Sequence, residues 1–190
     1  MVGIVVVSVL LLGGVGYGIY ALVKGGSKGL PSGWKEYSFN KDKFKAAFPD
    51  PPEVKDMGHM AQLPRGASAT GYIAKLGEGS GGVFVVALQI PMDFSVAQKD
   101  FLMGEFRRGM TSGASKRNNV RLSQPRQVTW AGQKAEEVTM EETGPGKSGG
   151  AVIRYMITEG GGYIAFVGTD TGRLSSDIEN AFFDSFRLLK

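Results

Sequence analysis

The 190-residue sequence contains no cysteine and only one histidine, His59. The absence of cysteine excludes disulfides, thiolate metal ligands, thiol nucleophiles and lipid anchors on cysteine. No carboxylate spacing typical of a calcium loop occurs. A Ser-His-Asp triad would depend on His59, and the G-x-S-x-G motif of many serine hydrolases is missing. We therefore predict no catalytic residue, no metal site and no cofactor.

The sequence also lacks a strong charge imbalance once its first residues are set aside. Lys24 and Lys28 supply two of the four net positive charges, so residues 34–190 are nearly neutral. A domain with so small a net charge is not expected to bind nucleic acid. One stretch is basic and holds no acidic residue, and it predicts an anionic-surface patch made of Arg107, Arg108, Lys116, Arg117, Arg121 and Arg126. The alternative is that this stretch is an ordinary solvated helix face and loop.

Residues 2–23 contain no charged side chain. A helix of that length is about 33 Å long, enough to cross a hydrocarbon core of about 30 Å. A cleaved signal peptide would need a basic start, a shorter apolar core and a small-x-small cleavage site, and these features are missing. We predict a transmembrane anchor over 1–23 that holds the chain in a lipid bilayer. Gly14 and Gly18 have the G-x-x-x-G spacing of close helix pairs, which predicts a weak homodimer through the anchor.

Residues 24–33 are rich in Gly, Ser and Pro and predict a flexible linker to a domain over 34–190. Most of that domain alternates like β-strands, and Val83–Ile90 is apolar enough for a central strand. Two segments have helical spacing, Ser95–Met110 and Leu174–Asp184, with serines at their starts. The remaining expected strands are Trp34–Phe39, Phe44–Phe48, Val54–Leu63, Ala67–Leu76, Val120–Thr129, Gln133–Glu142, Ala151–Thr158 and Tyr163–Thr169. Ser185–Leu189 is expected to be a short strand or an extension of the last helix. This order predicts an α+β domain with a mostly antiparallel sheet and two main helices. Gln133–Glu142 is expected to have one face in solvent.

Three local motifs resemble ligand-binding or catalytic sites, but the residues around each motif do not fit such a site. Residues 77–82 match G-x-G-x-x-G, but a strand follows where a dinucleotide site needs a helix. Residues 144–148 resemble a phosphate-binding loop, but Glu141 stands where a glycine is required. Asp170-Thr171-Gly172 is the tripeptide of aspartic proteases, which need two such carboxylates and more chain than follows here. We interpret all three segments as loops or turns.

The two ends of the domain resemble a known family. Trp34-Lys35-Glu36-Tyr37 followed by Phe44–Pro52 is similar to the opening of small bacterial PsbP-like domains, and 151–155, 162–166 and 181–186 resemble their close. Such domains are similar in fold to the extrinsic PsbP protein of photosystem II and to a nuclear import factor that binds the GTPase Ran. The resemblance implies an α-β-α sandwich, a binding or assembly role without catalysis, and often a location outside the cytoplasm. It carries over no catalytic residue, and the missing cysteine departs from the family's lipoprotein members.

The sequence leaves three functions open. The first is a membrane-tethered interaction or assembly module with an unknown protein partner. The second is a carrier of a small ligand or lipid, with a pocket between the sheet and the Ser95–Met110 helix. The third is a hydrolase without a recognisable motif. For the domain's location, Lys24 and Lys28 favour the cytoplasmic side. The resemblance favours the non-cytoplasmic side of the cell membrane, and we expect the latter.

Overall fold

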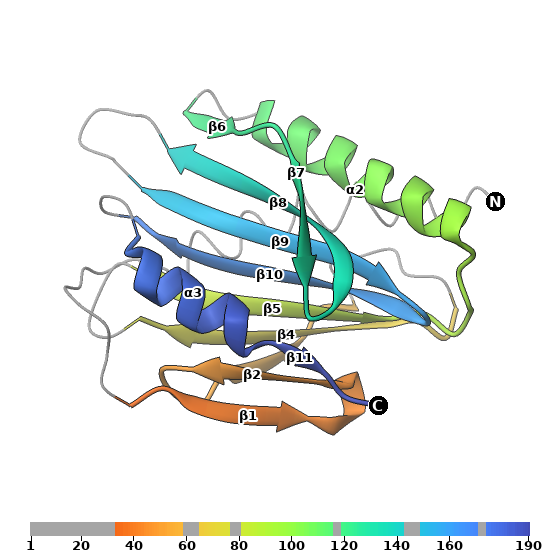
Figure 1. The fold of residues 1–190 in the computed structure, drawn as a ribbon, viewed down its shortest axis with the longest axis horizontal. Helices are drawn as coiled ribbons and strands as arrows, with labels where there is room; N and C mark the ends of the chain where they lie inside the picture. The colour runs from red at the N-terminus through yellow and green to blue at the C-terminus, as the bar shows by residue number, and fades with distance from the viewer. Residues whose placement is uncertain (1–32, 59–64, 77–80, 116–118, 143–148, 171–173) are drawn as a thin grey trace.

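The computed structural model describes residues 33–58, 65–76, 81–115, 119–142, 149–170 and 174–190. Within them a large antiparallel sheet lies between two helices, and a small second sheet lies beside one of these helices (Figure 1). The expected α+β class, with a mostly antiparallel sheet and two helices, is confirmed. The predicted anchor and linker lie outside the described residues, and among the described helices none is long and apolar enough to span a membrane.

The main sheet has eight strands: seven follow the order β3-β4-β5-β10-β9-β8-β6, and the eighth, β7, also pairs with β8. Its strands are β3 (Glu53–Asp56), β4 (Ser68–Lys75), β5 (Gly81–Gln89), β6 (Val120–Leu122), β7 (Arg126–Trp130), β8 (Gln133–Glu142), β9 (Gly150–Thr158) and β10 (Gly161–Thr169). The pairing of β5 with β10 is in register from Gly81 opposite Thr169 to Gln89 opposite Gly161. Both strands are buried over almost their whole length, as the apolar run at 83–90 predicts.

The second sheet has three strands in the order β1-β2-β11. The strands β1 (Lys35–Phe39) and β2 (Phe44–Phe48) form the expected hairpin around the 3-10 turn η1 (Asn40–Asp42). The last strand, β11 (Arg187–Leu188), pairs with β2, so the two ends of the domain meet in this sheet. In Figure 1 it lies at the opposite side of the molecule from the helix α2.

The helix α2 (Val96–Ser115) covers one face of the main sheet. Its start is capped as the sequence predicts, because Ser95 Oγ accepts from the Gln98 amide at 3.3 Å and Gln98 Oε1 accepts from the Ser95 amide at 2.8 Å. The helix runs five residues beyond the expected Met110. Its apolar stripe recurs at helical spacing and buries Leu102, Met103, Phe106 and Met110.

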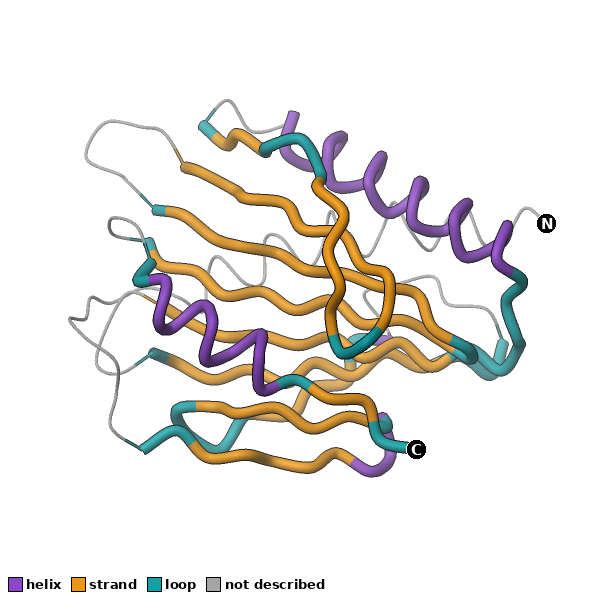
Figure 2. The backbone as a smooth tube through the Cα atoms, in the orientation of Figure 1, coloured by secondary structure: helices purple, strands orange, loops and turns teal. Residues whose placement is uncertain are grey.

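The helix α3 (Ser176–Ser185), the second sheet and the tip of the β7–β8 hairpin share the other face. Ser175 Oγ caps α3 by accepting from the Asp177 amide at 3.2 Å. The β7–β8 turn uses Ala131 and Gly132, both in the left-handed region, as a tight two-residue hairpin requires. Figure 2 shows this hairpin crossing over the main sheet toward the end of α3.

Two strand predictions are wrong in detail. The single strand expected at Val120–Thr129 is divided into β6 and β7, which follow each other along the same edge of β8 on either side of Pro125. Proline cannot donate to a ladder, so it breaks the strand. The strand β8 was expected to face solvent on one side, but Ala135, Glu136, Glu137 and Val138 are all buried. Both faces of β8 are covered at this point, one by α2 and the other by the α3 layer.

Candidate functional site

Two adjacent glutamates in the middle of β8 are the most unusual groups in the described domain. Glu136 and Glu137 are each 4% exposed, although ionised carboxylates are rarely buried without partners. Neighbouring residues of a strand point to opposite faces of the sheet. Glu136 therefore faces α2 and Glu137 faces α3, and the pair reaches into both layers of the domain.

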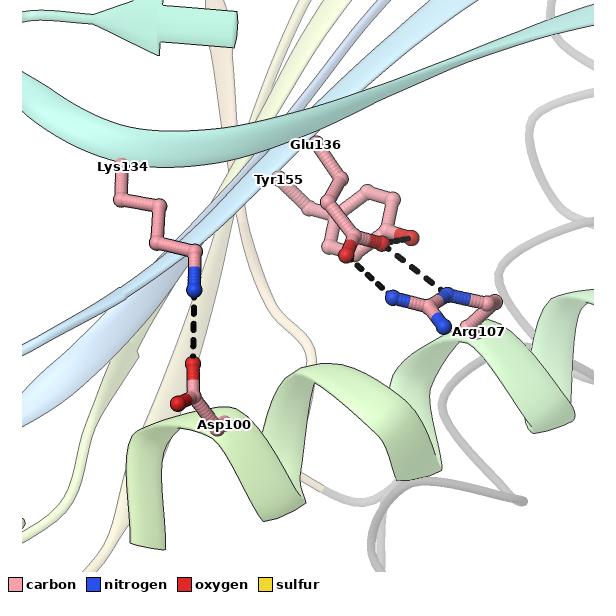
Figure 3. Close-up of polar contacts among 5 residues, drawn as sticks. All are labelled: Asp100, Arg107, Lys134, Glu136 and Tyr155. Carbon is pink, nitrogen blue, oxygen red and sulfur yellow. Dashed lines mark hydrogen bonds and ion pairs between the residues drawn. The ribbon is translucent and has the colours of Figure 1, made fainter. Parts of the chain in front are cut away.

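Glu136 is bound by an arginine from the helix and a tyrosine from the next strand. Arg107 of α2 donates from Nε to Glu136 Oε2 at 3.2 Å and from Nη2 to Oε1, and the Tyr155 hydroxyl donates to Oε2 at 2.5 Å. Figure 3 shows the three side chains converging between α2 and the sheet. Tyr155 lies opposite Glu136 in the β8–β9 register, so both point to the same face. We define Arg107, Glu136 and Tyr155 as the helix clamp.

The environment of the helix clamp favours one protonation pattern. Burial, and then the hydrogen bond to Glu136, raises the pKa of the Tyr155 phenol well above its ordinary value. The hydrogen bond to Glu136 also raises the pKa of the Arg107 guanidinium. Tyrosine is thus held as a neutral donor and arginine as a cation, both directed at one carboxylate. With three donors on its two oxygens, Glu136 has the geometry of a structural anchor rather than of a proton-transfer group.

Glu137 is bound in the same manner on the other face. Arg126 of β7 donates from Nε to Glu137 Oε1 at 2.7 Å, and Arg154 of β9 donates from Nε to Oε2 at 2.8 Å. The Arg154 guanidinium also lies over the Phe183 ring of α3, 4.2 Å from its centroid. We define Arg126, Glu137, Arg154 and Phe183 as the strand clamp, because it joins β7, β8 and β9 under α3.

A third buried carboxylate lies between the two sheets. Asp42 of η1 is fully buried, its Oδ2 accepts from the Tyr72 hydroxyl, and its main-chain oxygen accepts from the Tyr163 hydroxyl at 2.8 Å. Burial raises the pKa of Tyr163 to about 12, and burial and the bond to Asp42 raise that of Tyr72 still further. Within the described part of the chain, Asp42 Oδ1 has no hydrogen-bond partner. No group of three His, Cys, Asp or Glu side chains suited to a metal occurs among the described residues.

The structure separates the described members of the predicted anionic-surface patch. Arg107 and Arg126 extend to opposite faces of the main sheet and bind Glu136 and Glu137. Arg108 is ion-paired with the buried Glu105 one turn earlier in α2. Arg121 is exposed on β6, opposite Glu141 in the register with β8. Lys116 and Arg117 lie outside the described residues, as do His59, Gly14, Gly18 and the residues at 144–148. Binding of an anionic surface by this stretch stays a prediction.

The sequence contained one indication of the two clamps. A basic stretch without acids at 107–126 precedes a cluster of four glutamates at 136–142, and opposite charges so distributed can pair across elements. The pattern does not show that Glu136 and Glu137 would be buried, because glutamate is usually exposed. Arg154, Tyr155 and Phe183 could be found only from the register of β8 with β9 and the packing of α3.

The fold and these clamps define the class of the protein as an α+β domain in which buried ion pairs join the layers. No family profile and no curated protein sequence matches the chain. Among solved structures it is similar to cyanobacterial PsbP (CyanoP) from Synechocystis sp. PCC 6803, with 16% identity, a TM-score of 0.48, and coverage of 86% of this chain and 96% of the other. It is also similar to LpqN, involved in cell envelope biogenesis of Mycobacterium tuberculosis, with 9% identity, a TM-score of 0.39, and coverage of 86% and 83%. At TM-scores under 0.5 neither likeness carries an argument about partner or activity.

Proposed function

We propose that the chain is a PsbP-like, membrane-tethered interaction or assembly module that performs no catalysis and binds a protein partner. The proposal rests on one observation: the buried carboxylates are bound by side chains of the domain itself. Glu136 and Glu137 are saturated by arginine and tyrosine donors that join helices and strands. Catalytic carboxylates in an enzyme usually line a cleft and keep free lone pairs for a substrate. Here the two buried carboxylates are fully bound within the domain and rigidify it, as a docking scaffold requires.

The packing between α2 and the main sheet favours this module over a ligand carrier. The apolar stripe of α2 is buried against side chains of the sheet, and the layer includes Phe84, Val86, Ile164 and Phe166. A small ligand placed there would have to displace these side chains, at a cost of several kcal/mol for each well-packed residue lost. The carrier and the motif-less hydrolase remain the alternatives.

The outer side of α2 offers apolar side chains to a partner. Val96 is 76% exposed and Phe101 is 49% exposed, while the opposite stripe of the same helix is buried. An exposed aromatic side chain can supply a large share of the energy of a protein interface.

We propose that the domain lies on the non-cytoplasmic side of the cell membrane, anchored through residues 2–23.

Photo-crosslinking of the full chain in its native membrane tests the proposal. A photoreactive amino acid at Phe101 should yield one saturable protein adduct, and the same group at Val54 of β3, 58% exposed, is the matched control. Phe101→Ser should abolish the adduct in a chain labelled at Val96. A lipid or small molecule that co-purifies stoichiometrically would favour the carrier. Turnover of a substrate that a single substitution in the domain abolishes would favour the enzyme.

The side of the membrane is tested separately, and the absence of cysteine makes this simple. A Ser112→Cys variant carries a single thiol on the exposed side of α2. A membrane-impermeant maleimide should label it in intact cells. Labelling only after lysis would place the domain in the cytoplasm and contradict this part of the proposal.

A further inference from the structure

The second sheet carries a basic surface that the sequence does not reveal as one cluster. Its residues come from η1 and the residue that follows it, from β2, and from β11 and the end of the chain. We define the second-sheet basic surface as Lys41, Lys43, Lys45, Arg187 and Lys190. Lys41 and Lys43 are nearly 150 residues from Arg187 and Lys190 in sequence. Pairing of β11 with β2 sets Arg187 opposite Lys45, and the Leu189 amide donates to the Lys43 carbonyl at 2.9 Å.

These side chains lie on the outer side of the sheet. Phe44, Ala46 and Phe48 of β2 are fully buried and face the core, so the alternating Lys45 faces outward. Its register partners Ser38 and Arg187 share that outer face, and both are exposed. Lys41, Lys43 and Lys190 are exposed at the same end of the sheet.

The surface retains an excess of positive charge after its acidic neighbours are considered. Asp42 is fully buried and bound by Tyr72, so it does not neutralise the outer face. Glu36 is ion-paired with Lys45 at 2.9 Å, and Asp184 is exposed three residues before Arg187. Arg187 Nη1 donates to the Phe186 carbonyl at 2.8 Å, which fixes the guanidinium but leaves its charge. Five cations thus face two exposed carboxylates.

The position of this sheet in the chain favours a membrane as the partner. The strand β1 begins at Lys35, immediately after the predicted linker 24–33 and anchor. Ten residues can extend to at most about 36 Å, whereas the five residues of β1 span only about 17 Å. The linker is therefore long enough for the sheet to lie flat on the bilayer, and too short for the domain to move far away. Basic side chains near a membrane are attracted to anionic phosphates, each by roughly five-fold in affinity.

We propose that the second-sheet basic surface docks on anionic lipid phosphates and fixes the orientation of the domain on its membrane. The proposal rests on the tether in the proposed function and adds which face meets the bilayer. Docking of this face directs α2, at the opposite side of the molecule, away from the lipid and toward a protein partner (Figure 1). The exposed Val96 and Phe101 of α2 would then remain accessible.

Energy transfer in nanodiscs tests the orientation with the full chain. A donor dye is placed on Ser38→Cys in the second sheet or on Ser112→Cys in α2, and the acceptor is on lipid headgroups. In discs containing roughly 30% phosphatidylglycerol, whose anionic headgroups attract basic side chains, transfer from residue 38 should exceed transfer from residue 112. The difference should shrink in discs of phosphatidylcholine alone and as salt rises past about 0.5 M, where charges are screened within a few ångströms.

Charge reversal identifies the surface. The triple variant K41E/K43E/K190E should weaken docking on the order of 100-fold and remove the difference between the two dyes. The matched control is R65E/K75E/K134E, three exposed cations outside both basic surfaces, which should leave the difference intact. Equal transfer from both dyes, a larger transfer from residue 112, a loss in the control variant, or docking only after a protein is added would each overturn the proposal. Failure of the chain to remain in the discs would instead overturn the tether itself.

Discussion

The two faces of the main sheet are held by different chemistry. The α3 face is aromatic: Phe44, Phe48, Trp130, Phe182 and Phe186 are each at most 2% exposed and touch one another through their rings. The α2 face contains the methionines Met57, Met103 and Met110, each 6–7% exposed, and the helix clamp. Aromatic rings have few rotamers and fix one geometry, whereas methionine adapts to irregular gaps.

The two faces of the main sheet therefore have different structural roles. The α3 face unites the beginning and end of the domain, since β1, β2, α3 and β11 all meet there. On the α2 face a single helix is oriented by directed polar contacts at Glu136. We interpret the first face as the structural core and the second as the support that orients α2, the helix that we propose contacts a partner.

The largest expected effect is the loss of a ring from the α3 face. Phe186 is stacked on Phe44 with centroids 5.2 Å apart and contacts Trp130 at 4.3 Å. Phe186→Ala should lower the free energy of unfolding by about 4 kcal/mol, since truncating a buried Phe loses burial and leaves a cavity. Met110→Ala on the other face should cost only about 2 kcal/mol, because methionine is flexible and the cluster that holds it contains two further methionines that can adapt to lost volume. Urea unfolding of both full-length variants in detergent gives the comparison, and equal losses would contradict it.

The next effect concerns the helix clamp. Glu136→Ala removes the acceptor from Arg107 and from the buried Tyr155 hydroxyl. We expect a loss of about 2–3 kcal/mol, below the usual cost of breaking a buried pair because the Arg107 side chain is 47% exposed. The matched control is Lys134→Ala two residues away in β8, which loses an exposed ion pair with Asp100 at 3.0 Å (Figure 3).

Lys134→Ala should change stability by less than about 1 kcal/mol, as exposed ion pairs contribute little. Hydrogen exchange should show that Glu136→Ala speeds exchange in α2 more than in α3. A uniform increase in both helices would mean that Glu136 supports the whole domain and not the mounting of α2 in particular.

Much of this fold could be predicted from periodicity and turn residues. The order of the elements, the hairpin at Asn40–Asp42 and both serine caps are confirmed because each depends on neighbours in sequence. The burial of Glu136 and Glu137 could not be predicted, because it depends on arginines from α2, β7 and β9. The second sheet escaped prediction for the same reason, since it needs the pairing of β11 with β2. The burial of the two glutamates and the formation of the second sheet both depend on residues far apart in sequence, which the alternation along a single strand does not reveal.

The α3 side should also contribute more than the α2 side to the loss of stability at alkaline pH, because it holds two buried tyrosines with a raised pKa, Tyr72 and Tyr163, against Tyr155 alone on the α2 side. Burial raises the pKa of Tyr163 to about 12, while an unfolded tyrosine ionises near 10. The folded state therefore keeps its proton longer, and its stability is intact below pH 10 and falls as pH rises from 10 to 12. One tyrosine accounts for at most about 1.4 kcal/mol per pH unit. Tyr163→Phe should make the decline of unfolding free energy with pH shallower, and an unchanged slope would contradict this assignment.

Apart from the control Lys134→Ala, the smallest expected loss of stability is at Trp130 in the β7–β8 hairpin beside α3. Trp130 is 2% exposed, and its Nε1 donates to the Phe183 carbonyl at 3.1 Å. Trp130→Phe keeps an aromatic ring but removes the donor, so we expect a loss of about 1–2 kcal/mol from the bond and the smaller ring. Thermal unfolding of the full chain measures it. No measurable change would show that the ring contacts alone hold the hairpin.

Attachment to a membrane underlies both the proposed function and the docking of the second sheet, and alkaline carbonate extraction of native membranes is the decisive experiment. The full chain should remain in the membrane pellet, and a chain without residues 2–23 should be released to the supernatant. Recovery of the full chain in the supernatant would contradict the tether, the proposed function and the orientation inferred from the second-sheet basic surface.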